Sequence, residues 1–411
     1  MGKDKNVMNM IAGLDIGNGY VKGYASTDGQ DPTGIDFLSG VAIQTNDHEI
    51  KTRLQDAEPV IDDIFNMMAA SFDTPSIESR TLRLFGERAI SSGKSVDEFD
   101  VSSPITKARQ DLSVVLALGS IAGKALQDYY REYKNLPFEG VLRVNARIAI
   151  ALPISEYRDY RKEYAARFKD VVHMVSIHNF EMPVRIEIHV DDVVVMAEGA
   201  SAQYAITDKG LPLMESMLAD LRAHGEPFEG ITASDVLAAR STLGVDIGEG
   251  TVNFPVFQDG RFNADASATF PQGYGTVLEG ALERLRRKGI PFTSRKELAS
   301  YLLMPPTNML RKRYDYVASI VDEELEGFAI QVEAEFRKIL SKIGAFTEVI
   351  YVYGGGANAA KKQLYPRLIR VGKSMSPDNE GYPILYLDSR YSRHLNREGL
   401  YSIAKQIAEM K

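Results

Sequence analysis

The spacing of apolar and polar residues predicts a chain in which strands and helices alternate throughout. Five short apolar runs read as strands, at residues 10–16, 20–27, 141–151, 243–247 and 348–353. Apolar residues at helical spacing occupy residues 108–132, 156–168, 277–288, 294–303, 315–343 and 398–409. This mixture is typical of α/β architecture.

Two regions give less regular patterns. Residues 171–197 predict three strands, at 171–177, 182–190 and 191–197. Between residues 207 and 242, prolines and glycines separate two short helical patterns. Pro255 interrupts an otherwise strand-like run, and because proline does not donate a hydrogen bond to a sheet, we expect an edge strand or a bulge there.

Composition narrows the class of protein. The chain has 411 residues, of which 44% are hydrophobic and 25% charged, as in soluble globular proteins, and its length suggests two to four folded units. The net charge is −8, so a broad basic surface for DNA or anionic membranes is not expected. Cysteine is absent, which excludes disulfides, thiolate metal sites and cysteine nucleophiles. With no apolar run of membrane-spanning length and a polar start, the sequence predicts a cytoplasmic protein.

Two segments of the chain repeat one pattern. The first runs from Asp15-Ile16-Gly17-Asn18-Gly19 to Asp28-Gly29, and the second from Asp246-Ile247-Gly248-Glu249-Gly250 to Asp259-Gly260. The two aspartates of each segment lie 13 positions apart. Each segment follows an apolar strand, turns on two glycines and returns through a second strand. The sequence therefore predicts a duplicated β-hairpin.

The residues of these hairpins suit a phosphate and a metal ion. Glycines at the tips allow backbone N–H groups to converge on an anion. Each aspartate repels a bare phosphate, but it suits a hydrated Mg²⁺ ion placed between carboxylate and phosphate. Lys22 adds a positive charge three residues beyond Gly19, suited to β- or γ-phosphate oxygens. One such hairpin alone is typical of an ordinary turn, whereas two in the same register favour a nucleotide site.

A third glycine-rich segment follows the strand at 348–353. Gly354-Gly355-Gly356-Ala357 leads from this strand into a helical pattern that begins at Asn358. A strand, a glycine turn and a helix commonly bring the backbone close to a ribose or phosphate. Together with the two hairpins, this segment is predicted to hold the nucleoside end of the same ligand.

In this order, the three segments resemble those of the superfamily of actin, the Hsp70 ATPase domain and the sugar kinases. Elements outside the nucleotide segments are most similar to ParM-type bacterial actins. They are Ala151-Leu152-Pro153-Ile154-Ser155-Glu156-Tyr157, Val193-Val194-Val195-Met196-Ala197-Glu198-Gly199-Ala200 and Arg397-Glu398-Gly399-Leu400-Tyr401. The resemblance covers roughly three quarters of the chain.

The resemblance implies an actin-like α/β fold with two related domains, each with a mixed five-stranded sheet flanked by helices, and a nucleotide cleft between them. Residues 1–205 would form the first domain, closed by the helix at 395–411, and residues 206–394 the second, with an inserted segment near 208–240.

The resemblance also assigns roles at the site. Asp15 and Asp246 would hold waters of a Mg²⁺ ion, and Glu198 would position the water that attacks the γ-phosphate. The residues expected around ATP or GTP are Gly17, Asn18, Gly19, Lys22, Gly248, Glu249, Gly250, Thr251, Gly354, Gly355, Gly356 and Ala357. An oriented nucleophile matters more than a strong base in this reaction. Considered by itself, however, Glu198 also fits a solvated carboxylate at a helix start.

Three positions depart from the ParM pattern. Glu249 stands where a small residue is usual, and its carboxylate would repel a nucleotide unless it points outward. Ala197 replaces the usual proline before Glu198. The helix at 277–288 lacks a lysine where one would approach the base, and Arg284, Arg286 and Arg287 also fit a solvated helix face. The choice between ATP and GTP is left open.

The function implied is that of a nucleotide-dependent filament-forming protein that segregates plasmid DNA. The partners implied are further copies of the chain and an adaptor of the ParR type on a centromere-like site, with no direct DNA contact and no membrane. The alternative is a small-molecule, sugar-type kinase of the same superfamily, which would need a carboxylate base beside an acceptor hydroxyl. A chaperone with a separate substrate domain is a third class, for which the chain beyond the closing helix leaves no room.

Overall fold

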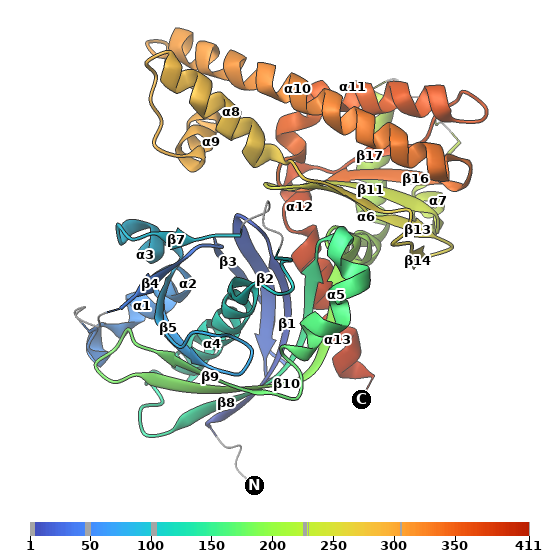
Figure 1. The fold of residues 1–411 in the computed structure, drawn as a ribbon. Helices are drawn as coiled ribbons and strands as arrows, with labels where there is room; N and C mark the ends of the chain where they lie inside the picture. Colours follow the sequence, from blue (N-terminus) through green and yellow to red (C-terminus); the bar gives the residue numbers. More distant parts are fainter. Residues whose placement is uncertain are drawn as a thin grey trace. The chain divides into compact units, whose positions relative to one another are not determined.

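The structure is a computed structural model that describes residues 5–45, 51–99, 105–224, 228, 230–304 and 306–410. It divides into two compact units (Figure 1): the first is Met1–Ala205 together with Asn396–Lys411, and the second is Ile206–Leu395. Four residues of the predicted insertion near 208–240, at 225–227 and 229, lie outside the described residues.

Among the described residues, ten strands form the sheet of the first unit, in the order β3-β2-β1-β8-β10-β9-β5-β6-β4-β7. They are β1 (Val7–Ile16), β2 (Tyr20–Thr27), β3 (Thr33–Leu38), β4 (Val41–Gln44), β5 (Ala69–Asp73), β6 (Leu82–Phe85), β7 (Val96–Asp97), β8 (Val141–Leu152), β9 (Val172–Ile177) and β10 (Val184–Ala197). The helices of this unit are α1 (Ala57–Asp62), α2 (Ile64–Met67), α3 (Gly86–Ser91), α4 (Asp111–Tyr133), α5 (Ile154–Ala166), the start of α6 (Ala200–Ala223) and α13 (Leu395–Glu409).

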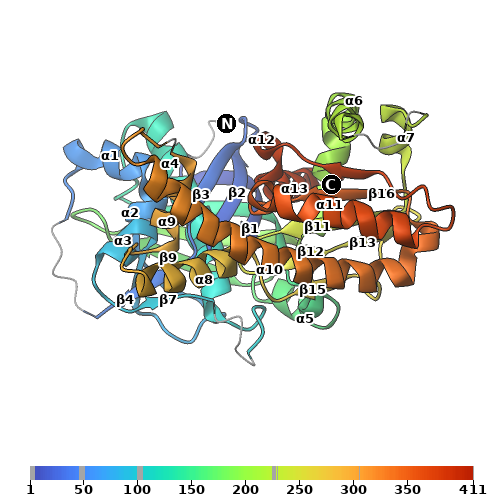
Figure 2. The ribbon, with the colours of Figure 1, turned by 90° about the horizontal axis from the view of Figure 1, so that it is seen from above.

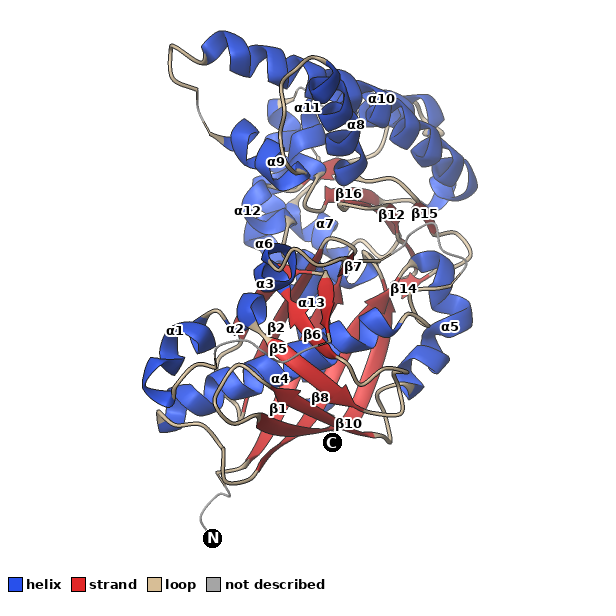
Figure 3. Cartoon of the chain, turned by 60° about the vertical axis from the view of Figure 1, so that its left-hand side comes forward, coloured by secondary structure: helices blue, strands red, loops and turns tan. Residues whose placement is uncertain are grey.

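Two helices cover the two faces of this sheet, and Figure 3 shows one of them, α4, crossing the strands. The long helix α4 is buried along nearly its whole length and packs with Met10, Ala12 and Ile148 in the main core. On the other face, Leu400 and Ala404 of α13 pack against alanines of β8. A side chain at Gly13 would meet the backbone of Tyr401 at 2.1 Å, so glycine is required for this close approach.

Among the described residues, seven strands form the sheet of the second unit. They are β11 (Thr242–Ile247), β12 (Val252–Phe254), β13 (Val256–Gln258), β14 (Arg261–Phe262), β15 (Ala268–Phe270), β16 (Val349–Tyr353) and β17 (Ile384–Tyr386). The helices are the rest of α6, α7 (Ala233–Ala238), α8 (Tyr274–Arg287), α9 (Arg295–Leu303), α10 (Arg311–Ile343), α11 (Ala357–Met375) and α12 (Ser389–Ser392). Helix α6 is interrupted at Gly210, where φ is 62°.

Helices α8, α10 and α11 lie side by side in this unit (Figure 2). The apolar stripe of α10 is buried, including Val321, Phe328 and Phe336. Ion pairs join the helix surfaces: Lys362 of α11 lies 2.8 Å from Asp322 of α10, and Arg284 of α8 lies 2.9 Å from Glu324. Arg284 therefore ties two helices together, which differs from the solvated helix face that its sequence context also allowed.

The two sheets share one core topology. In the first unit, β3, β2 and β1 are antiparallel neighbours, and β8 and β10 continue the sheet in parallel with β1. In the second unit, β12 and β13 together correspond to β2. Strands β14 and β15 together correspond to β3. Strand β16 corresponds to β8, and β17 corresponds to β10. The prediction of five strands in each sheet therefore holds only for this core. Five further strands extend the first sheet, and two of the five positions in the second are broken in two.

Two local predictions were wrong. Residues 182–197 were expected to form two strands, but the structure has the single strand β10 at Val184–Ala197, with a shift of register between Val190 and Asp192. Pro255 lies neither on an edge strand nor in a bulge: it separates β12 from β13, and both pair with β11 in an unchanged register. Gly244 donates its N–H to the carbonyl of Pro255 at 2.8 Å, so only the hydrogen bond that proline cannot donate is lost.

Candidate nucleotide site

The first hairpin joins β1 to β2 at a tip of three residues, Gly17, Asn18 and Gly19. The N–H of Gly17 donates to the carbonyl of Tyr20 at 3.0 Å. Ser39, which follows β3, closes the other side: its hydroxyl donates to the carbonyl of Gly17 at 2.6 Å, and its N–H to that of Gly19 at 3.1 Å. Carbonyl oxygens would repel a phosphate, but the carbonyls of Gly17, Gly19 and Tyr20 already accept hydrogen bonds from the protein.

Asp15 and Lys22 are cross-strand partners directly below this tip. Burial raises the pKa of the Asp15 carboxyl, and the negative charge of Glu198 raises it further, while the positive charges of Lys22 and Lys107 lower it. Asp15, Lys22, Glu198 and Lys107 therefore form one electrostatically coupled group at the carboxyl edge of the first sheet.

Glu198 follows the last residue of β10 and precedes α6. Its N–H donates to the carbonyl of Leu152 at 2.7 Å, which continues the pairing of β10 with β8. Its carboxylate lies 2.5 Å from the ammonium group of Lys107, whose side chain is buried, while the Glu198 side chain is partly exposed. Burial lowers the pKa of Lys107, but the charge and hydrogen bond of Glu198 outweigh it and raise the pKa above its usual value.

The second hairpin repeats the first. The N–H of Gly248 donates to the carbonyl of Thr251 at 2.9 Å, the same bond as in the first tip. The far ends match as well, because Asp28 and Asp259 have φ angles of 50° and 51°. Asp246 is buried and faces Asn253 across the ladder, where the first hairpin has Lys22.

The glycine loop after β16 packs directly against this hairpin. Gly354 has a φ of 102°, and a side chain there would meet the Asp246 carboxylate at 2.4 Å. The N–H of Gly356 donates to the carbonyl of Ile247 at 2.8 Å, and Ser392 donates its hydroxyl to the carbonyl of Gly354 at 2.9 Å. The loop thus brings the N-terminus of α11, which begins at Ala357, next to the strand that carries Asp246.

A second helix N-terminus meets the same hairpin. Helix α8 begins after Gly273, and the N–H groups of Tyr274 and Gly275 donate to the carbonyls of Gly248 and Glu249 at 2.9 and 2.8 Å. The Glu249 side chain points towards α9, where its carboxylate lies 3.7 Å from the guanidinium of Arg295. This contact offsets the charge that made Glu249 a doubtful residue for a phosphate loop.

Known proteins with similar sequences or structures agree with this geometry. Residues 244–365 match the family model described as archaeal actin homologue MreB-like, C-terminal. The structure of Bacillus thuringiensis ParM with ATP is similar, with a TM-score of 0.63 and 16% identity over 98% of this chain and 99% of that chain. The chain has the actin-like fold. The actin-like protein Alp7A gives a TM-score of 0.64 and 16% identity over 98% of both chains.

A less similar actin-like structure also has this fold. Ta0583, an archaeal actin homologue, is 12% identical over 97% of this chain and 99% of that chain, with a TM-score of 0.58. No curated protein sequence matches the chain. The predicted resemblance to ParM-type actins is thus confirmed for the fold, and the family model spans the second hairpin and the glycine loop.

Within this actin-like fold, the predicted residues gather in two groups. Asp15, Lys22 and Glu198 come together in the first unit, while Asp246, the second tip and the 354–357 loop come together in the second. Residues missed by sequence reasoning are Ser39, Lys107 and Gly273. Gly273-Tyr274-Gly275 lies between a strand and a helix, as the Gly354 loop does, so its pattern was available in the sequence.

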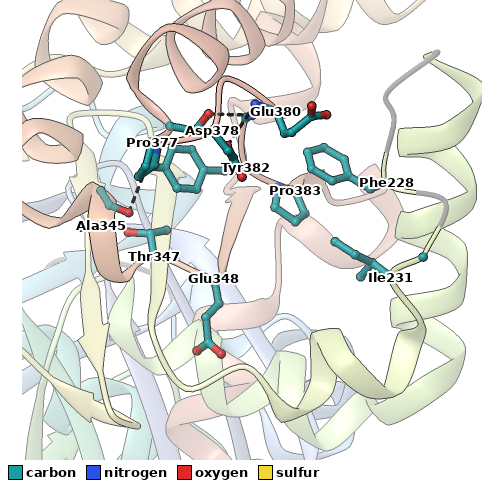
Figure 4. Close-up of a pocket in the computed structure, with 14 residues that line it drawn as sticks. Phe228, Ile231, Ala345, Thr347, Glu348, Pro377, Asp378, Glu380, Tyr382 and Pro383 are labelled. Carbon is teal, nitrogen blue, oxygen red and sulfur yellow. Dashed lines mark hydrogen bonds between the residues drawn. The ribbon is translucent and has the colours of Figure 1, made fainter.

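A separate cavity of about 540 Å³ lies elsewhere in the second unit (Figure 4). It is lined by Phe228, Ile231, Glu348, Asp378 and Tyr382, among others, near the amino ends of β16 and β17. The Glu348 carboxylate accepts the N–H groups of Arg240 and Ser241 at 2.8 and 2.7 Å. Because the glycine loop follows the carboxyl end of β16, this cavity is separate from the candidate site.

Two kinds of feature are absent from the part of the chain that the structure describes. Within the described part of the chain, no cluster of three or more acidic or histidine side chains could bind a metal directly. A metal held through water by single aspartates remains compatible with the residues present, because Asp15 and Asp246 each stand beside a hairpin tip. In the same described part, no helix is long and apolar enough to cross a bilayer.

Proposed function

We propose that this chain is an actin-like nucleotidase that assembles into filaments with ATP or GTP and disassembles after hydrolysis. The observation that supports this most directly is the group formed by Asp15, Lys22 and Glu198 at the carboxyl edge of one sheet. The hairpin in the second unit has the same tip geometry and an aspartate at the same place. Similar structures solved with ATP support a nucleotide as ligand.

Each residue has a definite task in this proposal. The backbone N–H groups of both tips bind the phosphates, and Lys22 neutralises charge on them. A Mg²⁺ ion, when bound, would offset the charge that develops on the phosphates, with Asp15 and Asp246 holding its waters. Glu198 orients the attacking water, and the N-termini of α8 and α11 carry the partial positive charge that suits an anion or ribose.

Plasmid segregation is the cellular role we propose, supported by the likeness to ParM in both sequence elements and fold. Filaments would push or pull DNA through an adaptor of the ParR type on a centromere-like site. The net charge of −8 agrees with attachment through an adaptor, in which the chain itself makes no DNA contact. We propose a cytoplasmic location on the same grounds.

Assembly with nucleotide is the experiment that tests this proposal. Micromolar full-length chain, Mg²⁺ and either ATP or GTP should give sedimentable polymer and filaments by electron microscopy. Glu198→Ala should assemble but release phosphate about 100-fold more slowly, since orienting a water contributes roughly that much. Wild-type chain that forms no polymer with either nucleotide contradicts the proposal, and phosphoryl transfer to a sugar without polymer would favour the kinase alternative.

A further inference from the structure

Lys107 is a buried cation that belongs to none of the predicted sequence motifs. Its side chain is 5% exposed, lies 91 residues from Glu198 in sequence and makes the shortest contact to the Glu198 carboxylate, at 2.5 Å. A buried ammonium group is costly unless it is paired, so this contact is a specific arrangement. Resting on the function proposed above, we propose that Lys107 is a positioning residue that holds the Glu198 carboxylate in the orientation needed to place the attacking water.

The loop that carries Lys107 is held firmly by α5. The Glu156 carboxylate accepts the N–H groups of Lys107 and Ala108 at 3.0 and 3.1 Å. Arg167, at the end of α5, donates to the carbonyl of Ala108 at 2.8 Å and to the carboxylate of Asp111 at 2.6 Å. These bonds fix the backbone on both sides of Lys107, so its ammonium group is placed by the fold.

This arrangement gives the element Leu152-Pro153-Ile154-Ser155-Glu156-Tyr157 a physical purpose. Glu156 does not reach the Glu198 carboxylate itself, but it holds the loop from which Lys107 does. The preceding residue, Thr106, has a buried hydroxyl without a hydrogen-bond partner among the described residues. A buried hydroxyl is normally satisfied, so a water or a ligand oxygen beside Lys107 would complete the group.

The other charges near the pair explain why Glu198 needs a cation. Asp15 adds a second carboxylate to the group, Tyr164 is buried beside it and uncharged because burial raises its pKa, and Lys22 stands across the ladder from Asp15. Without Lys107, the Glu198 carboxylate would lose the ion pair that holds it in place, and the fold would no longer fix its orientation.

Lys107→Met tests the proposal in the full chain. At neutral pH the kcat for nucleotide hydrolysis should fall at least about tenfold, while the nucleotide Kd changes by less than about threefold. The loss should fall on kcat because the Glu198 carboxylate is no longer held, whereas the groups that bind the nucleotide are unchanged. An unchanged kcat, or a loss confined to nucleotide affinity, would overturn the proposal.

Lys124→Met is the matched control. Lys124 is also buried, at 2% exposure, and it pairs with the Asp128 carboxylate within α4 of the same unit. This variant should lose stability in urea, as Lys107→Met does, yet keep the wild-type kcat. If it lowers kcat equally, the effect of Lys107 is structural and the inference fails.

A double variant keeps the test informative if Lys107→Met does not fold. Lys107→Met with Glu198→Gln buries no unpaired charge, and it should hydrolyse nucleotide as slowly as Glu198→Gln alone. A further loss of rate or a tenfold weaker nucleotide affinity would show that Lys107 acts on the phosphate directly and would overturn the proposal. Wild-type chain that neither hydrolyses nucleotide nor assembles would instead contradict the proposed function, so the two failures are distinguishable.

Discussion

The two units build the same five-position sheet, yet they use its equivalent ends differently. After β8, the first unit continues through Pro153 into α5, and the Glu156 carboxylate of that helix binds the loop carrying Lys107. After the equivalent strand β16, the second unit continues through three glycines, and Gly356 binds the hairpin strand itself. The same topology thus supplies a side-chain cation in one unit and a close backbone approach in the other.

The hairpins differ in a corresponding way. Lys22 faces Asp15 in the first, whereas uncharged Asn253 faces Asp246 in the second, where a buried Tyr353 is the neighbour in β16. The burial of Tyr353 and the negative charge of Asp246 raise the pKa of its hydroxyl well above its usual range, so it stays protonated. The two hairpins thus share the backbone geometry of the tip and differ in the side chains around it.

Gly354→Ala should have the largest effect of the variants that test this comparison. A side chain would meet Asp246 and the backbone of Ile247 at 2.4–2.6 Å, and φ is 102°. Displacing the loop would move the N-terminus of α11, so we expect nucleotide affinity to fall at least about 100-fold, a loss of about 2.7 kcal/mol. Isothermal titration of nucleotide and Mg²⁺ measures this.

Gly289→Ala is the control for that variant. It lies in the same unit with a φ of 72°, and a side chain there meets no atom within 4 Å. This variant therefore introduces only the strain of a side chain at positive φ. Its nucleotide affinity should stay within about twofold of wild type, a difference of ~0.4 kcal/mol. Equal losses in both variants would show that the close approach of the loop is unimportant.

Lys22→Asn gives the first hairpin the side chain of the second. Losing a charged hydrogen bond to phosphate costs about 1.5–3 kcal/mol, so affinity should fall roughly 10- to 100-fold. Lys162→Asn, on the exposed surface of α5, makes the same change of charge and should have little effect. Unchanged affinity in Lys22→Asn would mean that both hairpins bind through the backbone alone.

Asp15→Asn should have the smallest effect on the free protein, and in an unusual direction. Because burial raises the pKa of Asp15 in the folded state, its ionisation destabilises the fold as pH rises through that value. The variant should therefore have a higher urea midpoint than wild type at pH 7, and the difference should shrink below pH ~4, where the unfolded carboxyl is also protonated. A lower midpoint at pH 7 would contradict this account.

Much of the fold followed from local patterns. Strand β2 has the predicted ends, and α4, α10 and β16 lie within a few residues of the predicted positions. The error at β10 was to end one strand at Val190 and begin another at Asp191. In the structure Asp192 remains in the strand, with Arg147 and Lys169 at 3.6 and 3.7 Å, which are contacts no local pattern contains.

The site was predictable only in part, for a related reason. Hairpin tips and glycine loops are local, so their sequence shows them, and Gly273 could have been found by the same pattern. The short strands β4 to β7 gave no clear alternation because each spans only two to five residues. Ser39 and Lys107 act through contacts with residues 22 and 91 positions away, which depend on how the sheet is assembled.

The contact between Gly13 and α13 has a consequence for biosynthesis. Strand β1 is made first, whereas the helix that covers its outer face begins at Leu395, after the whole second unit. The second unit can thus fold during synthesis as one continuous segment. Until α13 is made, Ala149 and Ala151 in the sheet of the first unit stay exposed. Until α13 arrives, a nascent chain should present that bare face to chaperones, and the first unit should be the last part to become resistant to proteases.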